Sequence, residues 1–323
     1  MNRHIQRNVK TRLKEIMGRR PVGSGAADQT LRRAVQIFEN GPLTRASLPA
    51  AGTKLAALLK GDMPDVEIVR GPRTLSLKHA QTSLIAYETR VIEEVGQTLV
   101  SLESHAILLR KNDILFVSGL MPGMTRPHLF ERVLERGGPN QTFAGAQLQM
   151  PSLWPTVLLM RGQQRLANRG VPITAIITPF ANGLFFSSIE KLEGLPPSGP
   201  LRAIVDANGT HQLRLRDYYR DGPARVSVMT RTFVDSGKLS VSQCTLRDRL
   251  SAFIADFADV VADHDWRWKI GLGETDEAVS EFVRAFRIKV ASEKRRSKAY
   301  AALEAIITSE EWQQEESRNR ENQ

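Results

Sequence analysis

The feature that most constrains the fold is a series of short β-rich segments separated by turn signals between residues 171 and 235. Asn182-Gly183 and Asn208-Gly209 each lie between two such segments. An Asn-Gly pair flanked by β-rich segments is the strongest short-range signal for a two-residue hairpin. We therefore predict an antiparallel β-meander of about five strands, a common sheet size. The predicted strands cover residues 173–179, 184–190, 201–206, 210–219 and 224–234.

Helical periodicity dominates the chain before this region. Ile5, Val9, Leu13 and Ile16 repeat at helical spacing and predict an amphipathic helix that ends before Pro21. Further helices are predicted over residues 28–39, 53–60 and 74–95. Two apolar runs follow, residues 99–109 and 114–120, and they predict a strand pair that ends at the break Met121-Pro122-Gly123.

The chain after the meander is predicted to be helical. One helix is expected to begin at Thr245, with one apolar face continuing to Val261, and another at Thr275. The polar residues after Trp312 are expected to be frayed. The predicted fold class is therefore α+β, a meander with packed helices flanked by helical regions at both ends. We divide it into a basic helical N-terminal region (1–72), a central α+β domain (73–236) and a C-terminal helical region (237–323).

The positive charge of the chain is concentrated near its beginning. The formal net charge is +10, and the first 60 residues hold 12 Lys and Arg against 3 Asp and Glu. A localised basic block indicates a polyanionic partner, and we favour nucleic acid, RNA over DNA. A solubilising tail is the alternative, and an acidic membrane surface is a third reading. The candidate binding residues are Arg3, Arg7, Lys10, Lys14, Arg19 and Arg20, together with Arg214, Arg216 and Tyr218 on a basic and aromatic strand face.

Several classes of protein are disfavoured by what the sequence lacks. No apolar run approaches the length of a membrane span, so no membrane-spanning role is expected. Cys244 is the sole cysteine, which excludes an internal disulfide and suits a reducing, cytoplasmic location. The chain contains no phosphate-binding loop, zinc-protease motif, paired-cysteine motif or nucleophile elbow. We therefore expect no cofactor and no metal, and the isolated His105, His211 and His264 receive no role.

The segment from Thr125 to Pro139 carries the strongest candidate for chemistry. Pro127 is typical of a first helical turn, and Gly137-Gly138-Pro139 is a helix stop. At about 100° per residue, leucine, valine and phenylalanine residues occupy one side of this helix. The other side carries His128, Glu131, Arg132, Glu135 and Arg136. An ordinary solvated charged face is one interpretation. In the other, His128 carries a proton near neutral pH while Arg132 and Arg136 bind a phosphate.

The pattern from His128 to Gly137 resembles the opening helix of RelE-like or barnase-like ribonuclease-toxin relatives. The resemblance implies that an antiparallel sheet follows and that a late Thr-containing strand, here with Arg231 and Thr232, completes the site. It also implies metal-independent RNA cleavage, in which the ribose 2′-hydroxyl attacks the adjacent phosphate. A non-enzymatic nucleic-acid-binding or assembly protein that uses the basic N-terminal arm is the alternative. A third reading is a protein-interaction module whose basic arm meets an acidic partner, and a protein partner through the N- or C-terminal helices is also considered.

Overall fold

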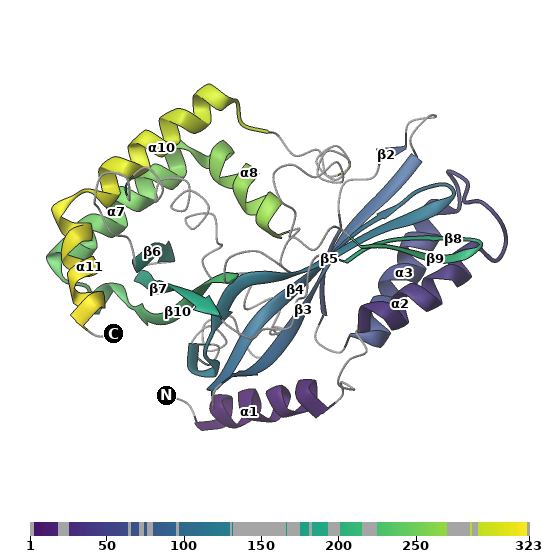
Figure 1. The fold of residues 1–323 in the computed structure, drawn as a ribbon, viewed down its shortest axis with the longest axis horizontal. Coiled ribbons are helices and arrows are strands. Elements are labelled where there is room, and N and C mark those ends of the chain that lie inside the picture. The colour runs from purple at the N-terminus through teal and green to yellow at the C-terminus, as the bar shows by residue number, and fades with distance from the viewer. Residues whose placement is uncertain are drawn as a thin grey trace.

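The computed structural model combines one large sheet with helices on both of its faces (Figure 1), so the predicted α+β class is confirmed. It describes residues 3–18, 26–63, 66–70, 74–75, 80–94, 97–129, 131, 166, 175–180, 183–192, 201–214, 225–269, 285 and 290–321.

The helices and strands have the following bounds. The helices before the sheet are α1 (Arg3–Gly18), α2 (Ala26–Ala34), the 3-10 turn η1 (Val35–Phe38) and α3 (Leu48–Asp62). The strands are β1 (Val66–Arg70), β2 (Thr74–Leu75), β3 (Ala80–Glu94), β4 (Gln97–Leu109), β5 (Asp113–Thr125), β6 (Ala175–Phe180), β7 (Gly183–Leu192), β8 (Leu201–Asp206), β9 (Gly209–Arg214) and β10 (Arg225–Val234). The helices after the sheet are η2 (Ser236–Lys238), α7 (Val241–Asp256), α8 (Ala258–Lys269), α10 (Glu293–Ile307) and α11 (Glu310–Glu321).

The sheet divides at β5. Its main path runs β1-β3-β4-β5-β10-β7-β6, and β8 also pairs with β5 and carries β9 on its other side. The first half of β5 pairs antiparallel with β8, whereas its last residues pair in parallel with β10, with Thr125 beside Thr230. One strand therefore has different neighbours along its length.

Both predicted hairpins are confirmed, but the prediction of a simple five-stranded meander is wrong. Phe180 of β6 lies opposite Gly183 of β7, and Asn208-Gly209 joins β8 to β9. Among the described residues the sheet has ten strands, and β8 and β10 pair with β5 rather than following in sequence order. The residues that form a turn are adjacent in the sequence and can be predicted from it. The strand beside which a hairpin packs depends on segments that are far away in the chain.

The helix predicted over residues 74–95 is also wrong, because this segment forms β2 and β3. Residues 83–89 are all buried. In a strand that is covered on both faces, apolar and polar residues no longer alternate along the sequence. That alternation is the signal that distinguishes a strand from a helix. The strand pair after it is confirmed as β4 and β5, which meet antiparallel.

The break predicted at Met121-Pro122-Gly123 does not end β5, which continues to Thr125. The register shifts there instead: Leu120 lies opposite Glu103, and Met124 lies opposite Ser101. The proline and glycine thus mark an irregularity in the ladder rather than a terminus.

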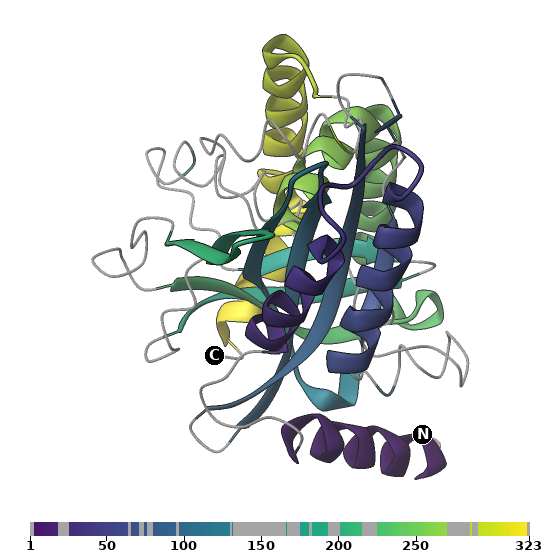
Figure 2. The ribbon, with the colours of Figure 1, turned by 90° about the vertical axis from the view of Figure 1, so that its right-hand side faces the viewer.

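Two hydrophobic cores lie on opposite faces of the sheet (Figures 1 and 2). Helices α2 and α3 cover one face, where Leu55 and Leu59 pack with Leu84 and Phe116. Helices α7, α8, α10 and α11 cover the other with Leu246, Leu250, Phe253, Val260, Leu303, Ile307 and Trp312.

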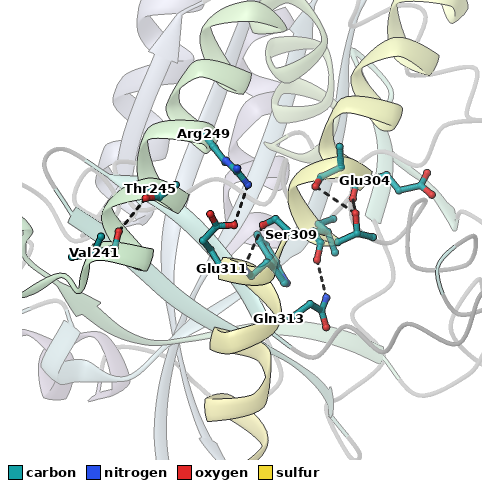
Figure 3. Close-up of polar contacts among 11 residues, drawn as sticks. Val241, Thr245, Arg249, Glu304, Ser309, Glu311 and Gln313 are labelled. Carbon is teal, nitrogen blue, oxygen red and sulfur yellow. Dashed lines mark hydrogen bonds and ion pairs between the residues drawn. The ribbon is translucent and has the colours of Figure 1, made fainter.

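The C-terminal helices differ from the prediction at both ends. Helix α7 begins at Val241, where Ser240 and Gln243 form a capping box, and the helical face is interrupted at Phe257. The predicted fraying after Trp312 is wrong, since α11 continues to Glu321. Figure 3 shows how Arg249 of α7 donates to Glu311 of α11 at 3.0 Å. The helix predicted from Thr275 falls mostly outside the described residues.

No helix in the described ranges has the length and apolar character needed to cross a bilayer.

Candidate functional site

Helix α1 docks on the sheet through its apolar stripe. Val9, Leu13 and Ile16 are buried, and they pack in a cluster with Val100, Leu129, Phe185 and Phe233. Figure 1 shows α1 lying across the end of the sheet, next to β3 and β4. The predicted stripe is therefore confirmed, and the N-terminal arm packs on the body of the protein.

The four cations of α1 that the sequence predicted as binding residues form an exposed row. Arg3, Arg7, Lys10 and Lys14 are all exposed. At about 100° per residue they fall within a sector of about 60°, and they span about 16 Å of helix axis. Glu15, the sole acidic residue of the helix, lies about 80° around the helix axis from the nearest of them, Arg7. We call these four residues the basic stripe; Arg19 and Arg20 lie outside the described residues.

His128 lies at the end of the sheet on which α1 docks. Its side chain is exposed, while the neighbouring Leu129 is buried in the cluster beneath α1. Because Thr230 aligns with Thr125, strand β10 carries its next residues toward the end of β5 from which the chain continues to His128. The topology therefore brings the predicted residues Arg231 and Thr232 to the same end of the sheet as His128.

A bulge in β10 sets the position of Arg231. Thr230 pairs with Ser187 and Thr232 with Phe186, so Arg231 is the extra residue of the strand. Its Nε donates to the Ser188 hydroxyl at 2.8 Å. Thr232 is exposed. Bulges often re-aim a side chain at a functional site, and this one accompanies the contact between Arg231 and Ser188.

Glu131 contradicts the interpretation of a wholly solvated charged face. Its side chain is only 5% exposed, and its Oε2 atom has no hydrogen-bond partner in the described structure. Of the two charged-face residues that the structure describes, His128 is therefore exposed and Glu131 is buried. Arg132, Glu135 and Arg136 lie outside the described residues.

The second predicted binding surface is described only in part. Arg214 is the last residue of β9, and its backbone pairs with Leu201. Arg216 and Tyr218 lie outside the described residues.

The structure brings together three residues that the sequence did not connect. Glu88 of β3 lies opposite Glu103 of β4, and His105 follows Glu103 on the same face. One ligand atom from each side chain lies within 4.8 Å of the other two. Predicting β3 as a helix concealed this pairing, since Glu103-x-His105 alone is a weak signal. The other two histidines are not isolated either, because His264 contacts the Tyr300 hydroxyl and His211 contacts Asp206.

The lowered carboxyl pKa values belong to the C-terminal helices. Burial would raise the pKa of Asp259, but hydrogen bonds from Arg295 and the backbone, with the Arg295 charge, lower it overall. Hydrogen bonds from its own backbone and from Ser309 lower the pKa of Glu311, and Arg249 adds to the effect. Both carboxylates make contacts between C-terminal helices, and neither belongs to the candidate site at the end of the sheet near α1.

Comparisons with protein-family models, curated proteins and solved structures find no match to this chain.

Proposed function

We propose that this protein binds nucleic acid through the basic stripe of α1. The observation that carries the proposal is that the two sides of this helix have different environments. Its apolar side is buried against the sheet, and Arg3, Arg7, Lys10 and Lys14 point outward along one line. A fixed helix loses less conformational freedom on binding than a flexible tail.

The length of the basic stripe suits a phosphate backbone. Its span of about 16 Å equals the axial rise of about five phosphates in one B-form strand, at about 3.4 Å each. Lysine and arginine at these positions would displace condensed counterions and give a salt-dependent affinity. RNA remains the favoured nucleic acid, and the proposal places this binding in the cytoplasm.

Fluorescence anisotropy with labelled RNA and DNA across salt concentrations tests the proposal. Four neutralised phosphates predict a slope of log affinity against log salt of about −3 for a single strand. A variant with all four stripe residues changed to Gln should lose most of that slope. The matched control changes Lys111, Lys238, Lys294 and Lys298, four exposed lysines elsewhere, to Gln. It removes the same charge and should retain the binding.

Two results would contradict nucleic-acid binding by α1. One is equal binding by the stripe variant and the control variant. The other is no salt-dependent affinity of the wild-type protein for RNA or DNA, which would favour an acidic protein partner instead.

Metal-independent RNA cleavage at His128 is the second candidate function. The exposure of His128, together with the placement of Arg231 and Thr232 at the same end of the sheet, supports it. An imidazole there could accept the proton of a ribose 2′-hydroxyl, and a guanidinium could stabilise the charge that develops on the phosphate.

Cleavage of labelled RNA in EDTA tests this second candidate. His128→Ala should abolish cleavage, whereas His211→Ala, which removes another exposed histidine, should not. A substrate with 2′-deoxyribose at the cleaved position should resist. Cleavage that persists in His128→Ala would contradict the catalytic role of His128 and would not affect the binding proposal.

A further inference from the structure

We infer that Glu88, Glu103 and His105 form a binding site for a divalent transition-metal ion, with Zn²⁺ as the best-suited ion. This inference stands independently of the nucleic-acid proposal, because the three residues lie on β3 and β4, within the sheet.

His105 is the residue that points to a ligand. Its side chain is fully buried, and neither ring nitrogen has a hydrogen-bond partner in the described structure. One ring face stacks on Phe116, with centroids 5.5 Å apart. A buried polar atom without a partner costs about 1–3 kcal/mol, so an imidazole left this way calls for an explanation.

A carboxylate oxygen lies near this ring at a distance that suits shared metal ligation. His105 Nε2 lies 3.6 Å from Glu88 Oε2, which is too long for a hydrogen bond. In a tetrahedral zinc site with bonds of about 2.1 Å, two ligand atoms lie about 3.4 Å apart. The observed separation is close to that value.

The sheet supplies the third ligand without any long connection. Glu103 is directly opposite Glu88 in the β3–β4 ladder, and it shares a face with His105 two residues later. All three ligand atoms lie within 4.8 Å of one another. Two carboxylates directly across a strand pair repel each other, and a dication between them removes that repulsion.

The donor set selects the class of ion. Imidazole nitrogen combined with carboxylate oxygen suits zinc and neighbouring first-row metals, whereas calcium and magnesium prefer oxygen ligands alone. Three protein ligands leave a fourth position for water. Glu103 is the least buried of the three.

Metal loading of the full-length protein tests the inference. The chain is stripped with chelator, loaded with Zn²⁺ and passed through gel filtration, and the bound metal is then measured by mass spectrometry. We expect one zinc per chain. Loading with Co²⁺ should give the visible absorption bands of a tetrahedral site.

Three conservative substitutions and one matched control locate the ion. Glu88→Gln, Glu103→Gln and His105→Gln should each weaken zinc binding by at least about 100-fold, since even outer-shell changes cost about 10–100-fold. The control is His211→Ala, because His211 and Asp206 form a similar but exposed pair, 3.4 Å apart. It should bind one zinc with unchanged affinity.

Circular dichroism establishes that each metal-free variant is folded, and the half-buried position of Glu103 makes Glu103→Gln the variant least able to disturb the core. Three results would overturn the inference. They are less than one zinc per wild-type chain at saturation, wild-type affinity in Glu103→Gln, and loss of zinc in His211→Ala. The first result decides the question even if a ligand variant fails to fold.

Discussion

At the scale of single residues, Gly183 shows how closely β10 approaches the start of β7. A Cβ atom at this position would lie 2.3 Å from the Val234 carbonyl oxygen and 2.5 Å from the Phe233 ring. Gly183→Ala should therefore destabilise the protein by about 1–3 kcal/mol in urea unfolding. Gly61→Ala is the matched control, since its Cβ would meet nothing within 4 Å and it lies in α3. It should stabilise by up to about 1 kcal/mol.

Glu131 offers a second test at this scale, because its carboxylate is buried with an oxygen that has no partner in the described structure. Glu131→Met keeps the length of the side chain and removes the unsatisfied polar group. We expect the free energy of unfolding to rise by about 1–3 kcal/mol. The same change at exposed Glu15 should have little effect. A clear loss of stability in Glu131→Met would show that the carboxylate is held by favourable contacts.

At the scale of elements, α11 closes an edge of the sheet. Strand β6 ends the main path of the sheet, and the fully buried Glu316 accepts a hydrogen bond from the Ala175 N–H at 2.9 Å. A carboxylate acceptor thus satisfies a backbone donor at the edge of the described sheet.

Removal of this acceptor should therefore be costly. We expect Glu316→Ala to lower the free energy of unfolding by about 2–3 kcal/mol, measured by urea denaturation, because it leaves a buried N–H unsatisfied. Glu310→Ala, at an exposed position in the first turn of the same helix, should change stability by less than about 0.5 kcal/mol. Equal effects of the two changes would argue against the edge-capping role.

Arg295 joins three helices of the C-terminal region, and its contact predicts a pH dependence. It donates to Asp259 of α8 at 3.3 Å, contacts the Asp256 carbonyl of α7, and lies 4.6 Å from the Phe257 ring centroid. The contact lowers the pKa of Asp259 in the folded state below its ordinary 3.8. A carboxylate of this kind contributes stability above its unfolded pKa and loses that contribution as the pH falls through the folded value.

The wild type should therefore be more stable than Asp259→Asn at neutral pH, by at most about 1 kcal/mol because the pair is partly exposed. The difference should shrink as the pH falls below 3.8. Urea unfolding of both proteins from about pH 7 to about pH 3 measures this difference in the free energy of unfolding. A difference that stayed constant over this range would exclude the Asp259 charge as its source.

At the scale of the whole molecule, helices from both ends of the chain complete the two cores. Residues of α7, α8, α10 and α11 cover one sheet face, and residues of α2 and α3 cover the other. Strand β1, which the sequence placed in the N-terminal region, pairs with β3. The central segment therefore shares its hydrophobic burial with both neighbours.

A truncation tests whether the central segment folds alone. The predicted domain 73–236 would expose Ile85, Tyr87 and Leu115, which the C-terminal helices cover. We expect this fragment to aggregate or to unfold without a cooperative transition, since exposed apolar patches of this kind are unfavourable. A monomeric fragment with a cooperative transition would instead support the predicted boundaries.

The sequence by itself determined the features that depend on neighbouring residues. The two Asn-Gly hairpins, the β4–β5 pair and the amphipathic α1 follow from turn chemistry and from the spacing of apolar residues, which need no distant partner. The four cations of the basic stripe were candidate binding residues from the sequence, whereas their outward-facing row was recognised only with α1 docked on the sheet.

Only the tertiary structure decided the features that depend on burial by distant segments. Strand β3 reads as a helix because helices at both ends of the chain bury it on both faces and remove its alternation. The choice of β5 as the neighbour of both β8 and β10 rests on strand pairing across long sequence separations. The cluster of Glu88, Glu103 and His105 exists only once β3 is paired with β4 in its observed register, and neither residue type nor spacing along the chain specifies that register.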